Sequence, residues 1–394
     1  MVEIPYELYC VDVTYGFTNR LANIRITEEE IKFLKTRCPY FNDAYLDFLT
    51  TFKLKPSEQI EIKFTPVNDT GSDSDTGDVE YLVKGLWVDT ILYEIPLLAL
   101  TSEAYFMFSD KDWDYSCQEE KAYRKGCTLL ENGCIFSEFG SRRRRDYHTH
   151  DLVMVGLMKA AEEGKRQGWK GRFTGSSNVH FAMKYGVDPV GTVAHEWYMT
   201  IAAITDDYEN ANELALRTSA SGPATTNEST VQSEAETKAP ITAPLRDGGA
   251  RTSHETYAQA YTGVRQDSGD PVYFVKMVRD FYDREGITDK KTMVFSDSLN
   301  IEHCLEYKVI AEEAGFQPVF GVDDFTNKSN DEKSKPLNIV IKISTANGHP
   351  AVKLSDNMGK NTGDKQKVQE VKKKLGYVEH EWEEGDESNR WSKR

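Results

Sequence analysis

A strand–helix–strand unit between Lys291 and Val322 places the strongest constraint on the fold. It consists of a short apolar strand, KTMVF, a polar SDS turn, a helix that ends near Gly315, and a second strand, PVFGV. Strands joined through a helix lie parallel in one sheet, and the loops after such strands collect active-site groups. The unit therefore predicts an α/β protein, with Asp297 or Ser298 as the expected cap of its helix.

A similar unit lies between Gly263 and Gly286. A short strand is followed by a polar loop, after which Asp270 can cap a helix and Pro271 stands at its first position. Two such units predict a parallel sheet at the centre of an α/β domain. We place this domain at residues 131–356.

The rest of the chain differs in pattern. Residues 1–130 are predicted to form a smaller N-terminal α+β domain. In it, Thr27 to Lys35 carries a capping threonine followed by acids, and Tyr81 to Pro96 alternates as a strand does before a bend. Residues 357–394 are a charged C-terminal extension, with a helix predicted around Val368 to Leu375.

Two segments interrupt the strand–helix order of the α/β domain. Leu337 to Asp356 predicts a two-stranded hairpin about an Asn347-Gly348 turn. Thr218 to Glu255 is rich in Ser, Thr, Ala and Pro and has no Phe, Trp or Tyr. Such a composition buries too little apolar surface to order itself, so this segment is predicted to be disordered.

The charge and the termini of the sequence narrow the class of protein. A formal net charge of −16 argues against a general nucleic-acid binder, which needs a basic face for phosphates. The six cysteines show no zinc spacing, and the N-terminus lacks the features of a signal peptide. The longest apolar stretch, Ile91 to Leu100, is interrupted by Glu94 and Pro96 and is too short to span a bilayer. We expect no membrane partner and a cytoplasmic location, with a nuclear pool left open.

The run GTVAHEW places His195 beside Glu196, after a small-residue turn and before an apolar helix predicted from Trp197 to Ile204. An imidazole at a helix start next to an acid can act as a base or as a nucleophile, including toward phosphate. The motif alone leaves a satisfied core histidine as the alternative.

Four consecutive arginines, Arg142 to Arg145, lie between a strand predicted at Cys134 to Phe136 and a helix predicted from about Leu152. With Asp151 as the cap of that helix, the guanidinium groups would stand near its N-terminus, a setting that suits phosphate or carboxylate. A solvated charge run and a nuclear-import patch are the alternatives.

The loop VRQDSGDP carries Arg265 and Asp267 directly after a predicted strand. Arg265 could pair with a carboxylate ligand. Asp267 has no capping duty, so it is the candidate for sugar hydroxyls or magnesium. The sequence contains neither a GxxxxGK[ST] loop nor a GxGxxG turn after a strand, and no set of metal ligands can be named from its spacing.

These runs together resemble nicotinate phosphoribosyltransferase, particularly its fungal members. The resemblance covers most of residues 11–217 and 257–394. It implies an irregular α/β barrel of the type II phosphoribosyltransferases with a smaller α+β domain, working as a homodimer. The runs that carry it, in this order, are EFGSRRRR, TGSSNVHFAMKYGVDPVGTVAHEW, YTGVRQDSGDPV, SDSLN, KPLNIVIKI and KLSDNMGKNTGD.

The resemblance implies an ATP-dependent ligase that joins nicotinate to 5-phosphoribosyl 1-diphosphate in the first step of NAD salvage from nicotinate. The products would be nicotinate mononucleotide and diphosphate, with Mg²⁺ required and ATP as co-substrate. The same resemblance assigns the site residues. His195 would be the phosphohistidine, Thr192 and Arg265 would hold nicotinate, and the phosphoribosyl diphosphate would be bound by Arg142, Arg143, Asp267 and Ser268.

The chain departs from the family pattern in three places. The N-terminal D-T-D-x-Y-K segment and the strand A-L-T-D-T-F-G-T are not found, and Thr218 to Glu255 stands in place of the strand. The phosphate-binding G-x-G-T turn is replaced by GVDDFTN, which puts Asp323 and Asp324 where backbone amides should meet a phosphate. These departures leave an alternative: a catalytically impaired paralogue, or a mis-joined gene product, that keeps the fold as a dimer partner or regulator.

Overall fold

The computed structural model divides the chain into two compact units, which are described separately. Unit 1 comprises Met1–Val190 and Val322–Ile341, and unit 2 comprises Gly191–Gly321 and Lys342–Arg394. The residues that the structure describes are 6–67, 69–72, 75–192, 194–208, 210–211, 214–215, 262–267, 269–296, 299–323, 325, 337, 339–354 and 361–376. The segment from Thr218 to Glu255, predicted to be disordered, lies outside these residues.

Unit 1 begins with a small antiparallel sheet of strand order β1-β3-β2. Its strands are β1 (Tyr6–Glu7), β2 (Ile60–Pro66) and β3 (Thr76–Val83). Residues of β2 alternate between half-buried and exposed, because one face of the hairpin packs on a helix and the other meets solvent. The half-buried face packs around Ala104 of helix α6 (Glu94–Phe108) through Ile62, Phe64 and Val79.

The predicted strand and bend at Tyr81 to Pro96 is correct only at its beginning. After β3 ends at Val83, the chain enters α5 (Trp87–Thr90), η2 (Ile91–Tyr93) and then α6. Of the apolar residues that suggested a strand, Tyr93 is buried, while Leu86, Val88 and Ile95 are exposed. Pro96 is tolerated in the first turn of α6, where no backbone N–H is needed.

Trp87–Phe108 is the one helical stretch among the described residues that is long and apolar enough to cross a membrane by length and composition. A core helix passes the same test, and α6 carries seven buried residues, including Leu97, Leu98 and Ala104. It packs against the antiparallel sheet of unit 1 on one side. The packing accounts for the apolar residues on the buried side of α6.

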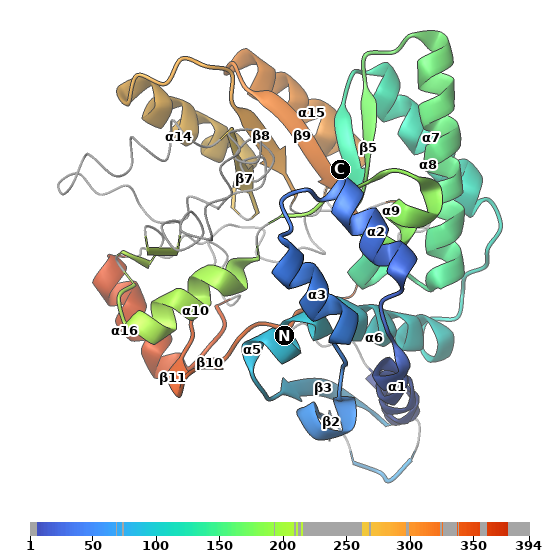
Figure 1. The fold of residues 1–394 in the computed structure, drawn as a ribbon, viewed down its shortest axis with the longest axis vertical. Coiled ribbons are helices and arrows are strands. Elements are labelled where there is room, and N and C mark those ends of the chain that lie inside the picture. Colours follow the sequence, from blue (N-terminus) through green and yellow to red (C-terminus); the bar gives the residue numbers. More distant parts are fainter. Residues whose placement is uncertain are drawn as a thin grey trace. The chain divides into compact units, whose positions relative to one another are not determined.

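The second part of unit 1 is a layer of parallel strands with helices. Strands β4 (Ile135–Glu138), β5 (Arg172–Ser176) and β6 (Asp188–Pro189) pair in parallel. Helices α7 (Gln118–Glu131) and α8 (Tyr147–Gln167) lie side by side (Figure 1). A Cβ on Gly156 would lie 2.3 Å from the backbone oxygen of Glu119, so this close helix approach requires glycine there.

Unit 2 contains the two predicted strand–helix units. Its parallel strands are β7 (Gly263–Gln266), β8 (Thr292–Phe295) and β9 (Gln317–Val322), of which the last residue is counted with unit 1. They alternate along the chain with α14 (Pro271–Arg284) and α15 (Ile301–Glu313). Figure 1 shows these strands beside one another, with the two helices along them. The parallel arrangement and the Asp270 cap are confirmed, since Asp270 accepts from Tyr273 N at 2.8 Å. The predicted cap of α15 is wrong: Asn300 caps it, accepting from His303 N at 2.7 Å.

The remainder of unit 2 is α10 (His195–Thr205), a hairpin of β10 (Thr345–Ala346) and β11 (His349–Pro350), and α16 (Lys365–Leu375). The hairpin turns at Asn347 and Gly348 as predicted, both with positive φ. Its strands are only two residues each, much shorter than the predicted alternation. The apolar side chains of this region pack onto α10 instead, in a cluster of Met199, Ala203, Ile343, Ala346 and Ala351.

The predicted helix from Thr27 is confirmed as α2, whose N-terminus has a complete capping box between Thr27 and Glu30. The helix predicted near the C-terminus is confirmed as α16. The other helical elements of unit 1 are α1 (Leu8–Arg20), η1 (Leu21–Asn23), α2 (Glu28–Arg37), α3 (Asp43–Thr51), α4 (Pro56–Gln59), η3 (Ser141–Arg143) and α9 (Val179–Tyr185).

Candidate active site

His195 is the first residue of α10 and contacts a carboxylate from the loop after β7. Its Nε2 lies 2.5 Å from Asp267 Oδ2, and the two side chains are mostly buried, with 17% and 19% of their surface exposed. Asp267 directly follows β7, at the carboxyl end of a parallel strand. The structure thus joins two predicted site residues that are far apart in the sequence.

Arg265 and Ser296 complete this cluster in unit 2. Arg265, the third residue of β7, forms an ion pair through Nη1 with Asp267 Oδ1. The same Nη1 donates to Ser296 Oγ at 3.3 Å, and Ser296 follows β8, the strand paired with β7. Ser296 was not predicted as a site residue, although its position in the polar turn after a strand was the signal that could have found it.

Burial and charge set the protonation of the pair. Burial acts to raise the pKa of Asp267, but the hydrogen bond from His195 and the charge of Arg265 outweigh it and hold this pKa far below its usual range. Burial lowers the pKa of His195 below its usual value, against the raising effect of Asp267. A neutral imidazole beside an ionised carboxylate is therefore the favoured state at neutral pH.

This state determines which ring nitrogen can react. Nε2 of His195 lies against the Asp267 carboxylate, and a hydrogen held there leaves the lone pair on Nδ1. No group among the described residues is hydrogen-bonded to Nδ1. An imidazole oriented by an acid in this way can act as a nucleophile.

The structure says less about the other residues predicted to bind substrate in this part of the site. Thr192 is half-buried and stands three residues before His195. Ser268 lies outside the described residues. The Nε of Arg265 is buried and has no hydrogen-bond partner in the described part of the chain.

The arginine run lies in unit 1, in the loop between β4 and α8. Arg142 is half-buried in η3, and Arg143 is buried and paired with Asp323, with 3.1 Å between Nη1 and Oδ2. Arg144 pairs with Glu103 at 3.3 Å. The guanidinium carbon of Arg145 lies 5.3 Å from the ring centre of Phe106 and 5.2 Å from that of Trp113.

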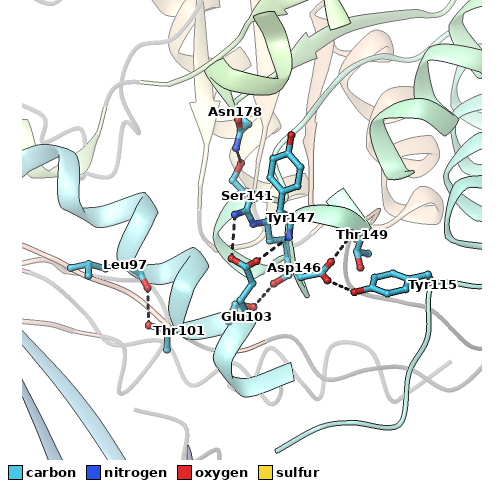
Figure 2. Close-up of polar contacts among 11 residues, drawn as sticks. Leu97, Thr101, Glu103, Tyr115, Ser141, Asp146, Tyr147, Thr149 and Asn178 are labelled. Atoms are coloured by element: carbon cyan, nitrogen blue, oxygen red, sulfur yellow. Dashed lines mark hydrogen bonds and ion pairs between the residues drawn. The ribbon is translucent and has the colours of Figure 1, made fainter. Parts of the chain in front are cut away.

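The predicted cap of the helix after this run is wrong. Helix α8 begins at Tyr147, and its cap is Asp146, which accepts from Thr149 N at 2.6 Å. Asp151 lies inside the helix and pairs with Lys184 at 2.5 Å. Figure 2 shows Asp146 between Thr149 and Tyr115, with Glu103 turned toward the start of the helix.

A fully buried polar network supports the loop that holds the arginines. Glu138, the last residue of β4, contacts His150 at 2.9 Å and accepts from Ser176 Oγ at 2.5 Å, and none of the three is solvent-exposed. Burial acts to raise the pKa of Glu138, but the contact with His150 outweighs it and the pKa is lowered. Glu138 also accepts from Gly140 N, so it fixes the start of the arginine turn. Sequence reasoning missed this network because its members lie on three separate elements.

Two family models match this chain and decide its identity. The N-terminal domain of the nicotinate phosphoribosyltransferase (NAPRTase) family matches residues 9–102, and the nicotinate phosphoribosyltransferase (NAPRTase) family matches residues 134–379. The chain belongs to the nicotinate phosphoribosyltransferase family.

Relatives within this family align along nearly the whole chain. The nicotinate phosphoribosyltransferase of Saccharomyces cerevisiae is 42% identical over 97% of this chain and 93% of its own length. That of Methanosarcina mazei is 38% identical over 88% of this chain and 82% of its own length.

Solved structures of nicotinate phosphoribosyltransferases have a fold similar to that of this chain. One from Saccharomyces cerevisiae has a TM-score of 0.82 and 40% identity, covering 95% of this chain and 89% of that one. The nicotinate phosphoribosyltransferase of Porphyromonas gingivalis has a TM-score of 0.76 and 27% identity, covering 95% and 90%.

These similarities confirm the predicted fold class and the function of a nicotinate phosphoribosyltransferase acting on small molecules. None of them favours the alternative of an impaired paralogue or a mis-joined product. The predicted domain boundaries at residues 130 and 356 stay a prediction.

The site residues offer few free ligands for a magnesium ion. Among the residues that the structure describes, no group of three or more His, Cys, Asp or Glu side chains is arranged to hold a metal. Both carboxylate oxygens of Asp267 are engaged, by His195 and Arg265. Mg²⁺ is often held by one or two carboxylates together with substrate phosphates, so the site fits an ion that arrives with a diphosphate.

Proposed function

We propose that this chain joins nicotinate to 5-phosphoribosyl 1-diphosphate in an ATP-dependent reaction that passes through a phosphohistidine at His195. The 2.5 Å contact between His195 Nε2 and Asp267 Oδ2 carries this proposal. It leaves Nδ1 as the nucleophilic nitrogen and supplies an anion that stabilises the imidazole as its charge rises.

In the first step, Nδ1 of His195 attacks the γ-phosphorus of ATP. The bond from that phosphorus to the oxygen of ADP breaks, ADP leaves, and an Nδ1–phosphorus bond forms. The hydrogen on Nε2 stays shared with Asp267 throughout. Hydrolysis of this phosphohistidine releases inorganic phosphate and restores the free imidazole.

In the second step, the ring nitrogen of nicotinate bonds to the anomeric carbon of the ribose, and the bond from that carbon to diphosphate breaks. Arg265 and Thr192 would hold the nicotinate, with the guanidinium directed at its carboxylate. Charge develops on the departing diphosphate, so cations near it lower the barrier.

The phosphoribosyl diphosphate would be bound by Arg142, Arg143, Asp267 and Ser268. Mg²⁺ would arrive with the diphosphate of the substrate and would neutralise charge on the leaving group. The protein's own part is to orient the substrate and to exclude water from the reacting carbon.

The test is incubation with ATP labelled at the γ-phosphate, nicotinate, phosphoribosyl diphosphate and Mg²⁺, followed by mapping of the bound phosphate. We expect acid-labile label on His195 and formation of nicotinate mononucleotide, and we expect His195→Asn to remove the label. His180→Asn is the matched control, since it removes an exposed histidine outside the proposed machinery. Label on another residue, or product formation without label, would contradict the phosphohistidine.

We also propose a homodimer in the cytoplasm, with a nuclear pool left open. Light scattering coupled to size-exclusion chromatography tests the dimer, and fractionation of cells tests the location. A monomeric mass at micromolar concentration would overturn the first part of this proposal.

A further inference from the structure

The segment after β9 is fixed against the loop after β4. Phe139 N donates to Val322 O at 2.8 Å, and the ring of Phe325 lies 5.8 Å from that of Phe136. Asp323 lies between these two contacts in the sequence. Backbone pairing on one side and ring packing on the other therefore hold its carboxylate in a defined position.

That position brings Asp323 to Arg143. Oδ2 of Asp323 lies 3.1 Å from Nη1 of Arg143, with 17% and 7% of the two side chains exposed. A guanidinium offers the same donors to a carboxylate and to a phosphate. A phosphate that uses Arg143 must therefore displace Asp323 or lie beside a like charge in a poorly hydrated place.

The partners of the neighbouring arginines are of another kind. Arg144 is held by Glu103 of α6, and Arg145 by two aromatic rings. Among the three arginines whose partners the structure describes, Arg143 is the one whose acid comes from a loop after a strand. Such loops are where α/β proteins bind their ligands.

We propose that Asp323 is an internal anion that competes with the phosphates of the substrate for Arg143, and that it weakens the affinity of this chain for phosphoribosyl diphosphate. The inference rests on the proposed function, in which Arg143 holds that substrate. It makes Asp323 an affinity-determining residue that touches an arginine of the binding site.

The experiment measures the dissociation constants of phosphoribosyl diphosphate and of inorganic diphosphate by calorimetry, with Mg²⁺ present. Asp323→Asn removes the charge and keeps the shape, so both ligands should bind roughly tenfold more tightly or better. Glu103→Gln is the matched control, because it makes the same change of charge next to the same arginine run. It should leave both constants within about twofold of wild type.

A double-mutant cycle tests whether Asp323 acts through Arg143. A purely structural role of Asp323 would not make its effect on affinity depend on Arg143. In an Arg143→Gln background, Asp323→Asn should no longer change the affinity, because the competition has been removed. Circular dichroism verifies that each variant is folded. If the asparagine variant does not fold, Asp323→Ser replaces it, since the hydroxyl can still accept from Arg143.

The outcomes separate the two proposals. Equal or weaker binding by the folded Asp323 variants overturns the inference, and weaker binding would make Asp323 a productive part of the site. An equal gain in the Arg143→Gln background overturns it as well. Absence of nicotinate mononucleotide synthesis by wild type, with the predicted gain for inorganic diphosphate intact, overturns the proposed function and leaves the competition standing.

Discussion

At the scale of single residues, the site depends on one imidazole and one carboxylate that adjust each other. Asp267 faces His195 with one oxygen and pairs with Arg265 through the other, so its negative charge is matched by the guanidinium and stabilised by the imidazole contact. This matching lowers the pKa of Asp267, and burial lowers the pKa of His195. Both shifts make folding favour the less protonated form.

The shifts predict how stability depends on pH. An unfolded chain binds protons at Asp267 below pH of about 4 and at His195 below about 6.5, whereas the folded chain resists both. The stability that these groups contribute is therefore present above those values and is lost as the pH falls.

Asp267→Asn should lower the free energy of unfolding at pH 7 by about 1–3 kcal/mol. The difference from wild type should shrink as the pH falls toward 3, measured by urea unfolding at a series of pH values. Asp188→Asn, which removes the acid of an exposed pair with Arg37, is the control and should stay near wild type. A difference that grows in acid would refute the assignment of charge to Asp267.

At the scale of elements, the sequence predicted the pieces whose signals are local. The cap at Asp270, the positive φ of Gly286 and the capping box at Thr27 act within a few residues, and α14 and α2 were predicted from them. The region from Tyr81 to Pro96 was mispredicted because its apolar residues suit a strand and a buried helix equally. In the structure Tyr93 packs with Ile60 and Val83 of the antiparallel sheet, a tertiary contact that the local pattern does not show.

The site residues, too, were predictable only where the signal is local in the sequence. His195, Asp267 and Arg265 stand in short runs that carry their chemistry, so they were named as candidates. Asp146 was missed as a cap because two aspartates precede the apolar positions of α8, and only the backbone decides between them. The pairing of Arg143 with Asp323 joins residues 180 positions apart, for which the sequence has no local signal.

The contact between α7 and α8 yields a prediction at this scale. Gly156→Ala should destabilise the protein by about 1–3 kcal/mol, because the new methyl group would meet the backbone of Glu119 at 2.3 Å and force the helices apart. Gly16→Ala in α1 is the matched control. Nothing lies within 4 Å of its new methyl group, so it should be neutral or stabilising by up to about 1 kcal/mol.

Thermal and urea unfolding measure both variants. Equal stabilities for the two substitutions would show that the close approach of α7 and α8 is not maintained in solution.

At the scale of the whole molecule, the arginine run is integrated into the fold. Arg143 and Arg144 are paired with acids, and Arg145 is buried against aromatic rings. The chain also carries a formal net charge of −16. We therefore do not expect the run to form a basic face of the kind that nucleic acids require.

We accordingly expect no binding of labelled RNA or DNA at physiological salt in an electrophoretic mobility-shift assay. A folded control with a basic surface should bind under the same conditions and lose its complex as salt is raised. Salt-sensitive binding by this chain, abolished by Arg142→Gln, would reverse the conclusion.

The packing of Arg145 against Phe106 and Trp113 has a consequence for tryptophan fluorescence. The indole of Trp113 lies 5.2 Å from the guanidinium and is anchored by a hydrogen bond from its Nε1 to Phe106 O at 2.9 Å. A rearrangement of the arginine loop that moves Arg145 would change the charge beside this indole. The fluorescence of Trp113 should therefore respond to movement of that loop. Comparison with Trp113→Phe would identify its contribution among the six tryptophans of the chain.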